Sequence, residues 1–150
     1  MHMHSSGKTA SPGNDLSPCY GGAVRRASRI LTRLYDEILS PSGLNLTQFT
    51  IAYRLVRHGS ATIGELAAWM DTDKTAMGRN LLPLERDGLI SIRAGEDRRS
   101  RQVTLTPKGL AHYKKAIPLW KQAQKRVEKQ LGRQWAASLL SLLNRVSADN

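Results

Sequence analysis

The hydrophobic positions between Thr62 and Thr106 change their spacing along the chain, and each spacing predicts a different element. Four apolar residues first recur at intervals of three and four, which places them on one face of an α-helix: Ile63, Leu66, Ala67 and Met70. Thr62 stands where this helix begins, and Glu65 follows three residues later, which is the spacing of a capping box. The pattern therefore predicts a short helix that starts directly after Thr62.

A second helix is predicted after a polar break. Asp71, Thr72 and Asp73 interrupt the apolar pattern and offer side chains that cap a new helix. Beyond them a narrow apolar face recurs at helical spacing: Ala76, Met77, Leu81 and Leu84. Pro83 is expected to kink or tighten the last turns, and Gly88 fits the position just beyond the helix end.

Past Gly88 the spacing of the apolar residues changes from helical to alternating. Ile90 and Ile92 alternate with polar residues, and Val103 and Leu105 do the same after a polar loop that contains glycine. A period of two on both sides of such a loop predicts a β-hairpin. The tip of this hairpin holds three arginines: Arg98, Arg99 and Arg101.

Two short helices joined by a tight turn and followed by a hairpin predict a winged helix-turn-helix, whose usual work is to bind duplex DNA. The polar face of the second helix carries small and hydrogen-bonding side chains, which suit close approach to base edges in the major groove. The arginine-rich tip is placed for contact with phosphates or the minor groove. The predicted DNA-binding residues are Thr72, Asp73, Lys74, Thr75, Gly78, Arg79, Asn80, Arg98, Arg99 and Arg101.

Helices are also predicted on the amino-terminal side of this region. A first long helix covers about residues 19–39, and Pro41 and Gly43 end it. Its apolar face consists of Val24, Ala27, Leu31, Leu34 and Ile38. A shorter helix, capped by Thr47, follows over about residues 48–57. The residues that it is expected to turn inward are Phe49, Ala52, Tyr53 and Val56.

The carboxy-terminal part of the chain predicts two more helices. Thr106 and Pro107 fit the cap and the first residue of a long helix, which runs to about residue 130, is kinked at Pro118 and is broken by Gly132. The last helix is rich in apolar residues: Trp135, Leu139, Leu142, Leu143 and Val146. Such a helix on a short chain needs a partner surface, which the first helix and a second subunit can supply; packing within one chain alone is the alternative.

The charge balance adds a partner to this picture. A formal net charge of +11 and a pI near 10.4 indicate a polyanionic partner. The first helix carries Arg25, Arg26, Arg29 and Arg33. The long carboxy-terminal helix and the residue after it carry Lys108, Lys114, Lys115, Lys121, Lys125, Arg126, Lys129 and Arg133. Either cluster is a solvated face, or the first faces phosphates or a ligand and the second steers the protein towards DNA.

Several classes of protein are disfavoured. The chain shows no phosphate-binding Gly-rich loop, no metal-ligand spacing and no constellation of catalytic residues, so we expect no enzyme, no cofactor and no metal site. A single cysteine, no apolar run of membrane-spanning length and no signal peptide favour the cytoplasm. Residues 1–16 are rich in Ser, Gly, Thr and Pro and are expected to form a flexible arm, in which His2 and His4 are either a metal site or incidental.

The combined motifs resemble the MarR family of bacterial transcriptional regulators. The matching pieces are residues 84–90 at the end of the second helix, residues 96–100 in the wing, and residues 103–109 leading into the long helix. The resemblance implies a mainly α-helical fold with a small β-hairpin over residues 17–150. It comprises a DNA-binding lobe at about 47–106 and a dimerisation lobe built from helices at about 19–39 and 107–147.

The resemblance also implies partners and contacts. It implies a homodimer that binds a pseudo-palindromic operator in double-stranded DNA, usually as a repressor released by a ligand or an oxidant. A short strand at residues 60–62 would pair with the wing, and Asp97 would pair with a wing arginine such as Arg101. A winged helix used as a protein-interaction module is an alternative. The arginine-rich wing and the polar face of the second helix argue against it.

The input that would release such a regulator from DNA has two interpretations. One is a small aromatic or lipophilic ligand, in a pocket between the two lobes lined by Tyr20, Tyr53, Trp69 and His112. The other rests on a resemblance to the organic-hydroperoxide-sensing branch of the family, to whose reactive cysteine and tyrosine Cys19 and Tyr35 correspond. That branch's second tyrosine falls at Leu46 here, so an ordinary structural role for Cys19 also stays open.

Overall fold

The computed structural model describes residues 18–97 and 99–148. The predicted flexible arm, with His2 and His4, lies outside these residues. The described elements are α1 (Tyr20–Leu39), η1 (Ser40–Ser42), α2 (Leu46–His58), β1 (Ala61–Thr62), α3 (Ile63–Trp69), α4 (Lys74–Arg86), β2 (Ile90–Ala94), β3 (Arg101–Leu105), α5 (Pro107–Leu131) and α6 (Arg133–Ala148). The predicted fold class, mainly helical with a small hairpin, is confirmed.

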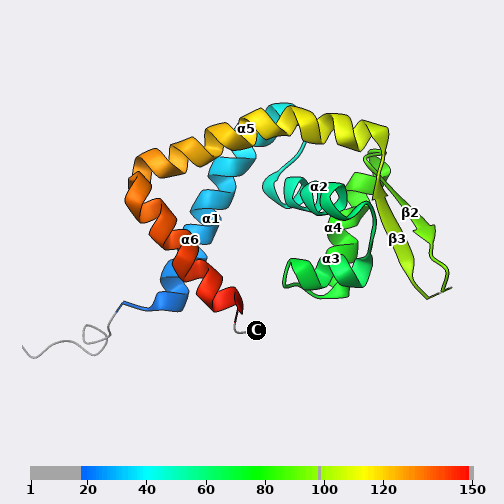
Figure 1. Ribbon diagram of the computed structural model, residues 1–150, viewed down its shortest axis with the longest axis horizontal. Helices are drawn as coiled ribbons and strands as arrows, with labels where there is room; N and C mark the ends of the chain where they lie inside the picture. The colour runs from blue at the N-terminus through cyan, green and yellow to red at the C-terminus, as the bar shows by residue number, and fades with distance from the viewer. Residues whose placement is uncertain (1–17, 98, 149–150) are drawn as a thin grey trace, which may run out of the picture.

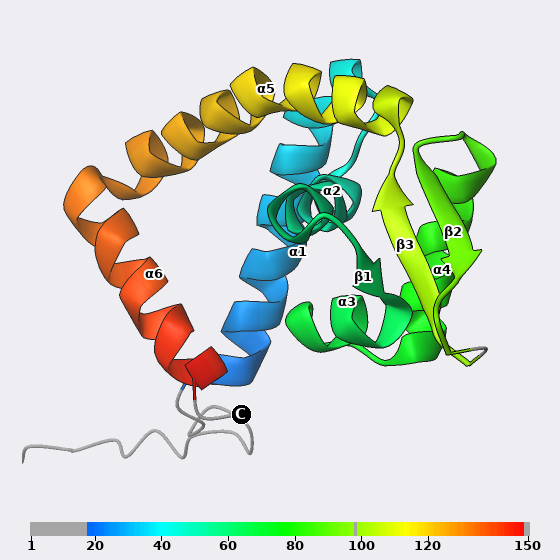
Figure 2. The same ribbon diagram turned by 45° about the vertical axis from the view of Figure 1, so that its right-hand side comes forward.

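The elements divide into two lobes that share α5. Figures 1 and 2 show α5 bowed along one edge of the molecule. One lobe, made of α2, α3, α4 and the three strands, lies beneath the start of α5, and α6 descends from its other end towards the beginning of α1. α5 runs unbroken through Pro118 and ends at Gly132, whose φ of +86° suits glycine.

The sheet is small and antiparallel, with the strand order β1-β3-β2. Ile92 pairs with Val103 across the hairpin, and Ala61 of β1 pairs with Val103 on the other side. Val103 is fully buried, because the central strand packs against the helices of this lobe. The strand expected near residues 60–62 is therefore present as β1, and it ties the start of α3 to the wing.

An apolar core joins the helices to the sheet. Its fully buried side chains are Leu39, Ile51, Leu55, Leu66, Met77, Leu81 and Val103. Burial of one such side chain stabilises a fold by about 1.5–3 kcal/mol. Because α3 and α4 each insert apolar residues into this core, their orientation relative to the wing is fixed by packing.

Most predicted helix ends are confirmed. Thr62 and Glu65 form the expected capping box at α3, with hydrogen bonds of 3.0 and 3.1 Å. Thr106 caps α5, and its hydroxyl oxygen accepts a hydrogen bond from the backbone N–H of Gly109. Gly88 follows α4 with a φ of +73°, a left-handed conformation that glycine adopts without strain.

The prediction for α2 was wrong in two respects. Asn45, and not Thr47, caps the helix, because Asn45 and Gln48 exchange reciprocal hydrogen bonds and start the helix earlier. Tyr53 and Val56 are 38% and 44% exposed, whereas Ile51 and Leu55 are buried. α2 packs against both α5 and the sheet. The face of α2 that is buried therefore differs from the face that the spacing of its apolar residues predicted.

None of the helices in the described ranges combines the length and the apolar character that a membrane crossing requires. The cytoplasmic location stays a prediction.

Candidate nucleic-acid interface

The turn between α3 and α4 holds the start of α4 firmly. Asp71 adopts a φ of +49°, a left-handed conformation that aspartate tolerates better than most residues. The backbone N–H of Thr72 donates to the carbonyl of Ala67 at 2.9 Å. Asp73 then caps α4 by accepting a hydrogen bond from the N–H of Ala76 at 2.7 Å. The carboxylate of Asp73 is thus engaged in capping α4.

One stripe of α4 faces away from the core. At 3.6 residues per turn, Thr75, Arg79 and Leu82 lie on the side opposite the buried residues of α4, and Gly78 lies at the border of that side. Thr75 and Arg79 are exposed, and Leu82 is 62% exposed. Lys74 and Asn80 are also exposed but lie on the two flanks of this stripe. We call Thr75, Gly78, Arg79 and Leu82 the outer stripe; sequence analysis missed Leu82, although its i+7 spacing from Thr75 places it there.

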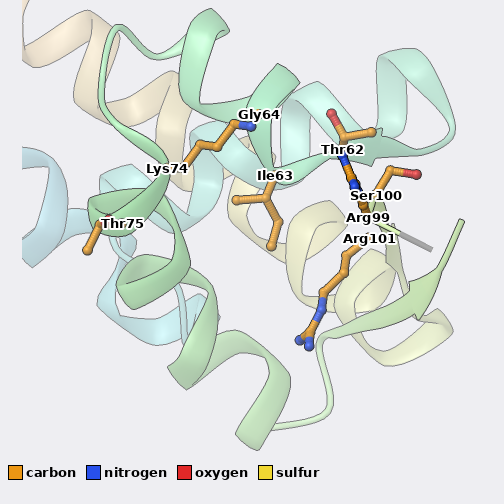
Figure 3. Close-up of a pocket in the computed structure, with 8 residues that line it drawn as sticks. All are labelled: Thr62, Ile63, Gly64, Lys74, Thr75, Arg99, Ser100 and Arg101. Atoms are coloured by element: carbon orange, nitrogen blue, oxygen red, sulfur yellow. The ribbon is translucent and has the colours of Figure 1, made fainter. Parts of the chain in front are cut away.

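A basic pocket lies between the outer stripe and the wing. It encloses about 410 Å³ and is lined by Thr62, Ile63, Gly64, Lys74, Thr75, Arg99, Ser100 and Arg101. Figure 3 shows Lys74 reaching back towards Gly64, with Arg99, Ser100 and Arg101 gathered beside Thr62. Three predicted residues from two elements, Lys74, Arg99 and Arg101, therefore come together, while Thr62, Ile63, Gly64 and Ser100 were not predicted.

Gly64 determines the course of the Lys74 side chain. An ideal Cβ on Gly64 would lie 3.0 Å from Cε of Lys74 and 3.5 Å from its Nζ. The end of the Lys74 side chain thus packs on Gly64 of α3, at the wall of the pocket. No sequence pattern indicated this contact, because it joins two helices across the turn.

The wing is shaped by its own hydrogen bonds. The N–H of Gly95 donates to the carbonyl of Ser100 at 2.7 Å, and the N–H of Arg99 donates to the carboxylate of Asp97 at 3.2 Å. Among the described residues no ion pair joins Asp97 to Arg99 or Arg101, so the expected pair with Arg101 is absent there. Arg98 lies outside the described residues. The exposed guanidinium groups of Arg99 and Arg101 are left for another partner.

A second, aromatic groove lies where α2 meets α5. It encloses about 420 Å³ and is lined by Phe49, Thr50, Tyr53, Tyr113, Ile117 and Trp120. The rings of Phe49 and Tyr113 stack with centroids 5.3 Å apart. Burial, and to a smaller extent Tyr53, raises the pKa of Tyr113 above its ordinary value. The guanidinium group of Arg57 lies 5.8 Å from the centroid of the Tyr53 ring.

The four predicted effector-binding residues do not come together. Tyr53 lines the aromatic groove, but Tyr20 is 90% exposed at the start of α1. Trp69 stacks on His58 with ring centroids 4.2 Å apart. His112 lies under Gly43, where an added Cβ would come within 2.9 Å of its Nδ1. The other aromatic residues of the groove are Phe49, Tyr113 and Trp120. Each lies on the apolar face of its helix, where sequence spacing does not distinguish a core residue from a ligand contact.

Cys19 and Tyr35 lie at opposite ends of α1. Cys19 is exposed and caps the helix, with its Sγ accepting a hydrogen bond from the N–H of Gly22 at 3.4 Å. Sixteen residues of helix separate the two side chains by about 24 Å. The hydroxyl of Tyr35 donates to the side-chain oxygen of Gln124, and burial, then Glu128, raises the pKa of Tyr35. Within one chain these residues do not form a common site.

Comparisons with known proteins agree with this geometry. A profile of the MarR family matches residues 42–100. The transcriptional regulator MosR of M. tuberculosis, solved in complex with DNA, is 36% identical over 89% of this chain and 99% of its own, with a TM-score of 0.76. A MarR variant from E. coli complexed with operator DNA is 26% identical over 84% of this chain and 91% of its own, with a TM-score of 0.76.

A curated relative agrees with these structures. The HTH-type transcriptional regulator YwoH of Bacillus subtilis (strain 168) is 28% identical over 90 residues, which span 60% of this chain and 66% of that protein. These relatives are transcriptional regulators and not enzymes, as the sequence led us to expect. The chain belongs to the MarR family of DNA-binding transcriptional regulators.

Proposed function

We propose that this protein is a homodimeric repressor that binds a pseudo-palindromic operator and leaves it when a small aromatic or lipophilic ligand binds. The observation that carries the proposal is the pairing of an outward-facing stripe on α4 with a basic pocket beside it. A helix of this kind enters the major groove, and the cations at its side hold the flanking phosphates. Mobility shifts with the DNA upstream of its own gene, compared with a scrambled duplex, test this proposal.

The predicted DNA-binding residues take different roles in this proposal. Arg79 and Thr75 of the outer stripe contact base edges, and Leu82 contacts thymine methyl groups or sugars. Lys74, Arg99 and Arg101 hold phosphates in the basic pocket. Arg98 lies outside the described residues and keeps its predicted role as a contact at the minor groove. Asp73 and Thr72 shape the turn, and Asn80 contacts the DNA from the flank of α4.

Gly78 gives a separate test of groove binding. An ideal Cβ on Gly78 would have no atom within 4 Å, and glycine inside a helix costs about 1 kcal/mol relative to alanine. We expect Gly78→Ala to raise the melting temperature and yet weaken operator binding, because the added methyl group meets the DNA. Calorimetry and mobility shifts on one sample measure both effects. An unchanged operator affinity would place this part of α4 outside the groove.

Dimerisation is proposed from the apolar surface of the second lobe. α6 has no buried residue, and Trp135 and Leu140 are 66% and 59% exposed. A groove of about 520 Å³ between α1, α5 and α6 is lined by residues that include Val24, Leu31 and Leu143. Apolar surface of this extent is typical of an interface, and a second copy would cover it.

We expect light scattering to give about twice the chain mass of 16.6 kDa. Leu140→Glu should yield monomers, since a carboxylate would be buried in the interface without a partner. It should also bind operator more weakly, since two α4 helices reach successive major grooves only when joined. A monomeric wild-type protein at micromolar concentration would contradict a dimer.

The aromatic groove is the proposed effector site. It lies between α2 of the DNA-binding lobe and α5, which continues into the other lobe. A ligand that wedges these helices apart would change the spacing of the two DNA-binding lobes in a dimer, which lowers DNA affinity if the ligand prefers that form. Stacked rings suit an aromatic ligand, and Arg57 at Tyr53 suits a carboxylate on it.

Oxidation of Cys19 is the second candidate input, favoured by its exposure at the start of α1. Cys19→Ser preserves a helix cap, so this variant should fold normally. We expect benzoate to release wild type and Cys19→Ser from operator DNA equally, and an organic hydroperoxide to release neither. Release of the wild type alone by the hydroperoxide would establish Cys19 as the sensor. Mobility shifts at increasing concentrations of each compound make the comparison.

A further inference from the structure

The exposed side of α5 carries a run of cations that DNA binding through α4 does not use. We define the basic ridge as Lys114, Lys115, Lys121, Lys125, Arg126 and Lys129. All six side chains are exposed. At 100° per residue they lie on the side of α5 opposite its buried residues, which include Tyr113, Ala116 and Ala123. From Lys114 to Lys129 the ridge is about 22 Å long.

The basic ridge differs from an ordinary solvated helix face. Solvated faces usually alternate in sign and pair their charges at i, i+4. Here Lys121, Lys125 and Lys129 repeat at i, i+4 and i+8, an arrangement of like charges that destabilises a helix. Within the described residues no ion pair joins the ridge to a carboxylate. Glu128, the one acid of α5, is half-buried and close enough to Tyr35 to raise its pKa.

The position of the ridge separates it from the proposed operator site. Figures 1 and 2 both place α5 at one edge of the molecule and α3 at the opposite edge. The buried side of α5 faces α1, α2 and η1, so the ridge points away from the DNA-binding lobe. Two copies of the chain would not bury the ridge in their interface, because like charges opposed in a symmetric interface repel each other.

We propose that the basic ridge binds the phosphate backbone of a second DNA duplex while the protein is bound to its operator, so that one dimer bridges two DNA segments. Charge complementarity supports this occupant. Duplex DNA carries one charge per 1.7 Å or so and offers about 13 phosphates over the length of the ridge. Near its end, Arg126, Lys129 and Gln130 line an open hollow of about 550 Å³ that is large enough for a phosphate group. This binding is independent of base sequence and rests on the proposed operator binding.

The test is capture of a second duplex. Biotinylated operator DNA is immobilised, saturated with protein and washed, and a fluorescent duplex of scrambled sequence is then added at low salt. We expect the wild type to retain the second duplex. The triple variant Lys121→Gln, Lys125→Gln, Lys129→Gln should lose most of this capture. For the capture that remains, the slope of log affinity against log salt concentration should be less steep by about two to three units. Its operator affinity should stay within a factor of about three of wild type.

A matched control removes the same charge elsewhere. Arg25→Gln, Arg26→Gln, Arg29→Gln on α1 also lowers the charge by three and should leave capture intact. Equal loss of capture in both triple variants would overturn the proposal, because overall charge would then explain the capture. Undiminished capture by the ridge variant would also overturn it. Operator-bound wild type that retains phosphatidylglycerol vesicles but no second duplex would overturn it in favour of a membrane surface. Failure of the proposed function itself would be seen earlier, as absence of protein from the immobilised operator.

Discussion

Replacing Gly109 with alanine should destabilise the protein more than the same replacement at any other glycine in the described helices. Gly109 lies in the first turn of α5, where an ideal Cβ would clash with the carbonyl oxygen of Leu89 and lie 2.7 Å from Cδ1 of Leu105. The carbonyl belongs to the backbone and cannot rotate away. The start of α5 would have to move off the sheet, a strain that we set at about 3 kcal/mol, the upper part of the overpacking range.

The contact at Gly109 matters because it joins α5, which both lobes share, to the lobe that contains α4 and the wing. The N–H of Thr106 donates to the carbonyl of Leu89 at 3.0 Å, and the Thr106 hydroxyl donates to the carbonyl of Gly88. Nζ of Lys108 donates to the carbonyl of Asp87. These bonds hold the end of α4 and the beginning of β2 against α5. Gly109→Ala should therefore also loosen the wing relative to α5, and protease cleavage between the lobes should accelerate.

Calorimetry should record a fall in melting temperature of about 6–12 °C for Gly109→Ala, from 2–4 °C per kcal/mol in a domain of this size. Gly78→Ala, in open space, is the matched control and should move the melting temperature upwards. If helix propensity outweighed the clash, Gly109→Ala would stabilise the protein by about 1 kcal/mol. A rise in melting temperature would thus refute the close packing of α5 on Leu89.

Arg79→Ala should lower the affinity for the operator about 5- to 150-fold, which corresponds to loss of one bidentate base contact worth about 1–3 kcal/mol. Arg79 is exposed on the outer stripe of α4, away from the core. Binding to a scrambled duplex should change little, because that binding depends on phosphates. Titration of both duplexes at one salt concentration gives the ratio of affinities.

Arg101→Ala provides the contrast. Arg101 lines the basic pocket with Lys74, so its removal should weaken binding to both duplexes and reduce the slope of affinity against salt by about one unit. If Arg79→Ala also weakened both duplexes equally, Arg79 would be a phosphate contact and base recognition would lie elsewhere on α4. If Arg101→Ala changed neither affinity nor slope, the wing would not touch DNA.

The elements that the sequence predicted well are those specified by neighbouring residues. The capping box of Thr62 and Glu65 closes within four residues, and the start of α5 depends on Thr106 and Pro107 alone. The wing follows from alternation on either side of one loop, and its pairing of Ile92 with Val103 keeps apolar residues on the core side. Local hydrogen bonds and periodicity suffice for such features.

The features that were missed depend on contacts between distant segments. Spacing in α2 could not reveal that this helix packs on two sides, so Tyr53 was expected inside and Leu55 was not. The passage of Lys74 across Gly64 joins two helices, and the aromatic groove combines Phe49 of α2 with Trp120 of α5. Predicting these sites requires the crossing of the helices, which sequence periodicity does not contain.

Specific binding of operator DNA through α4 is the central claim, and one measurement tests it most directly. Duplexes selected by the protein from fragments of its own genome are footprinted, and their dissociation constants are compared with those of scrambled duplexes at physiological salt. We predict two protected half-sites whose centres lie about 34 Å, or a multiple of that distance, apart. We also predict a preference for the selected sequence of at least about 10³-fold. Equal affinity for selected and scrambled DNA, with no discrete footprint, would contradict the claim.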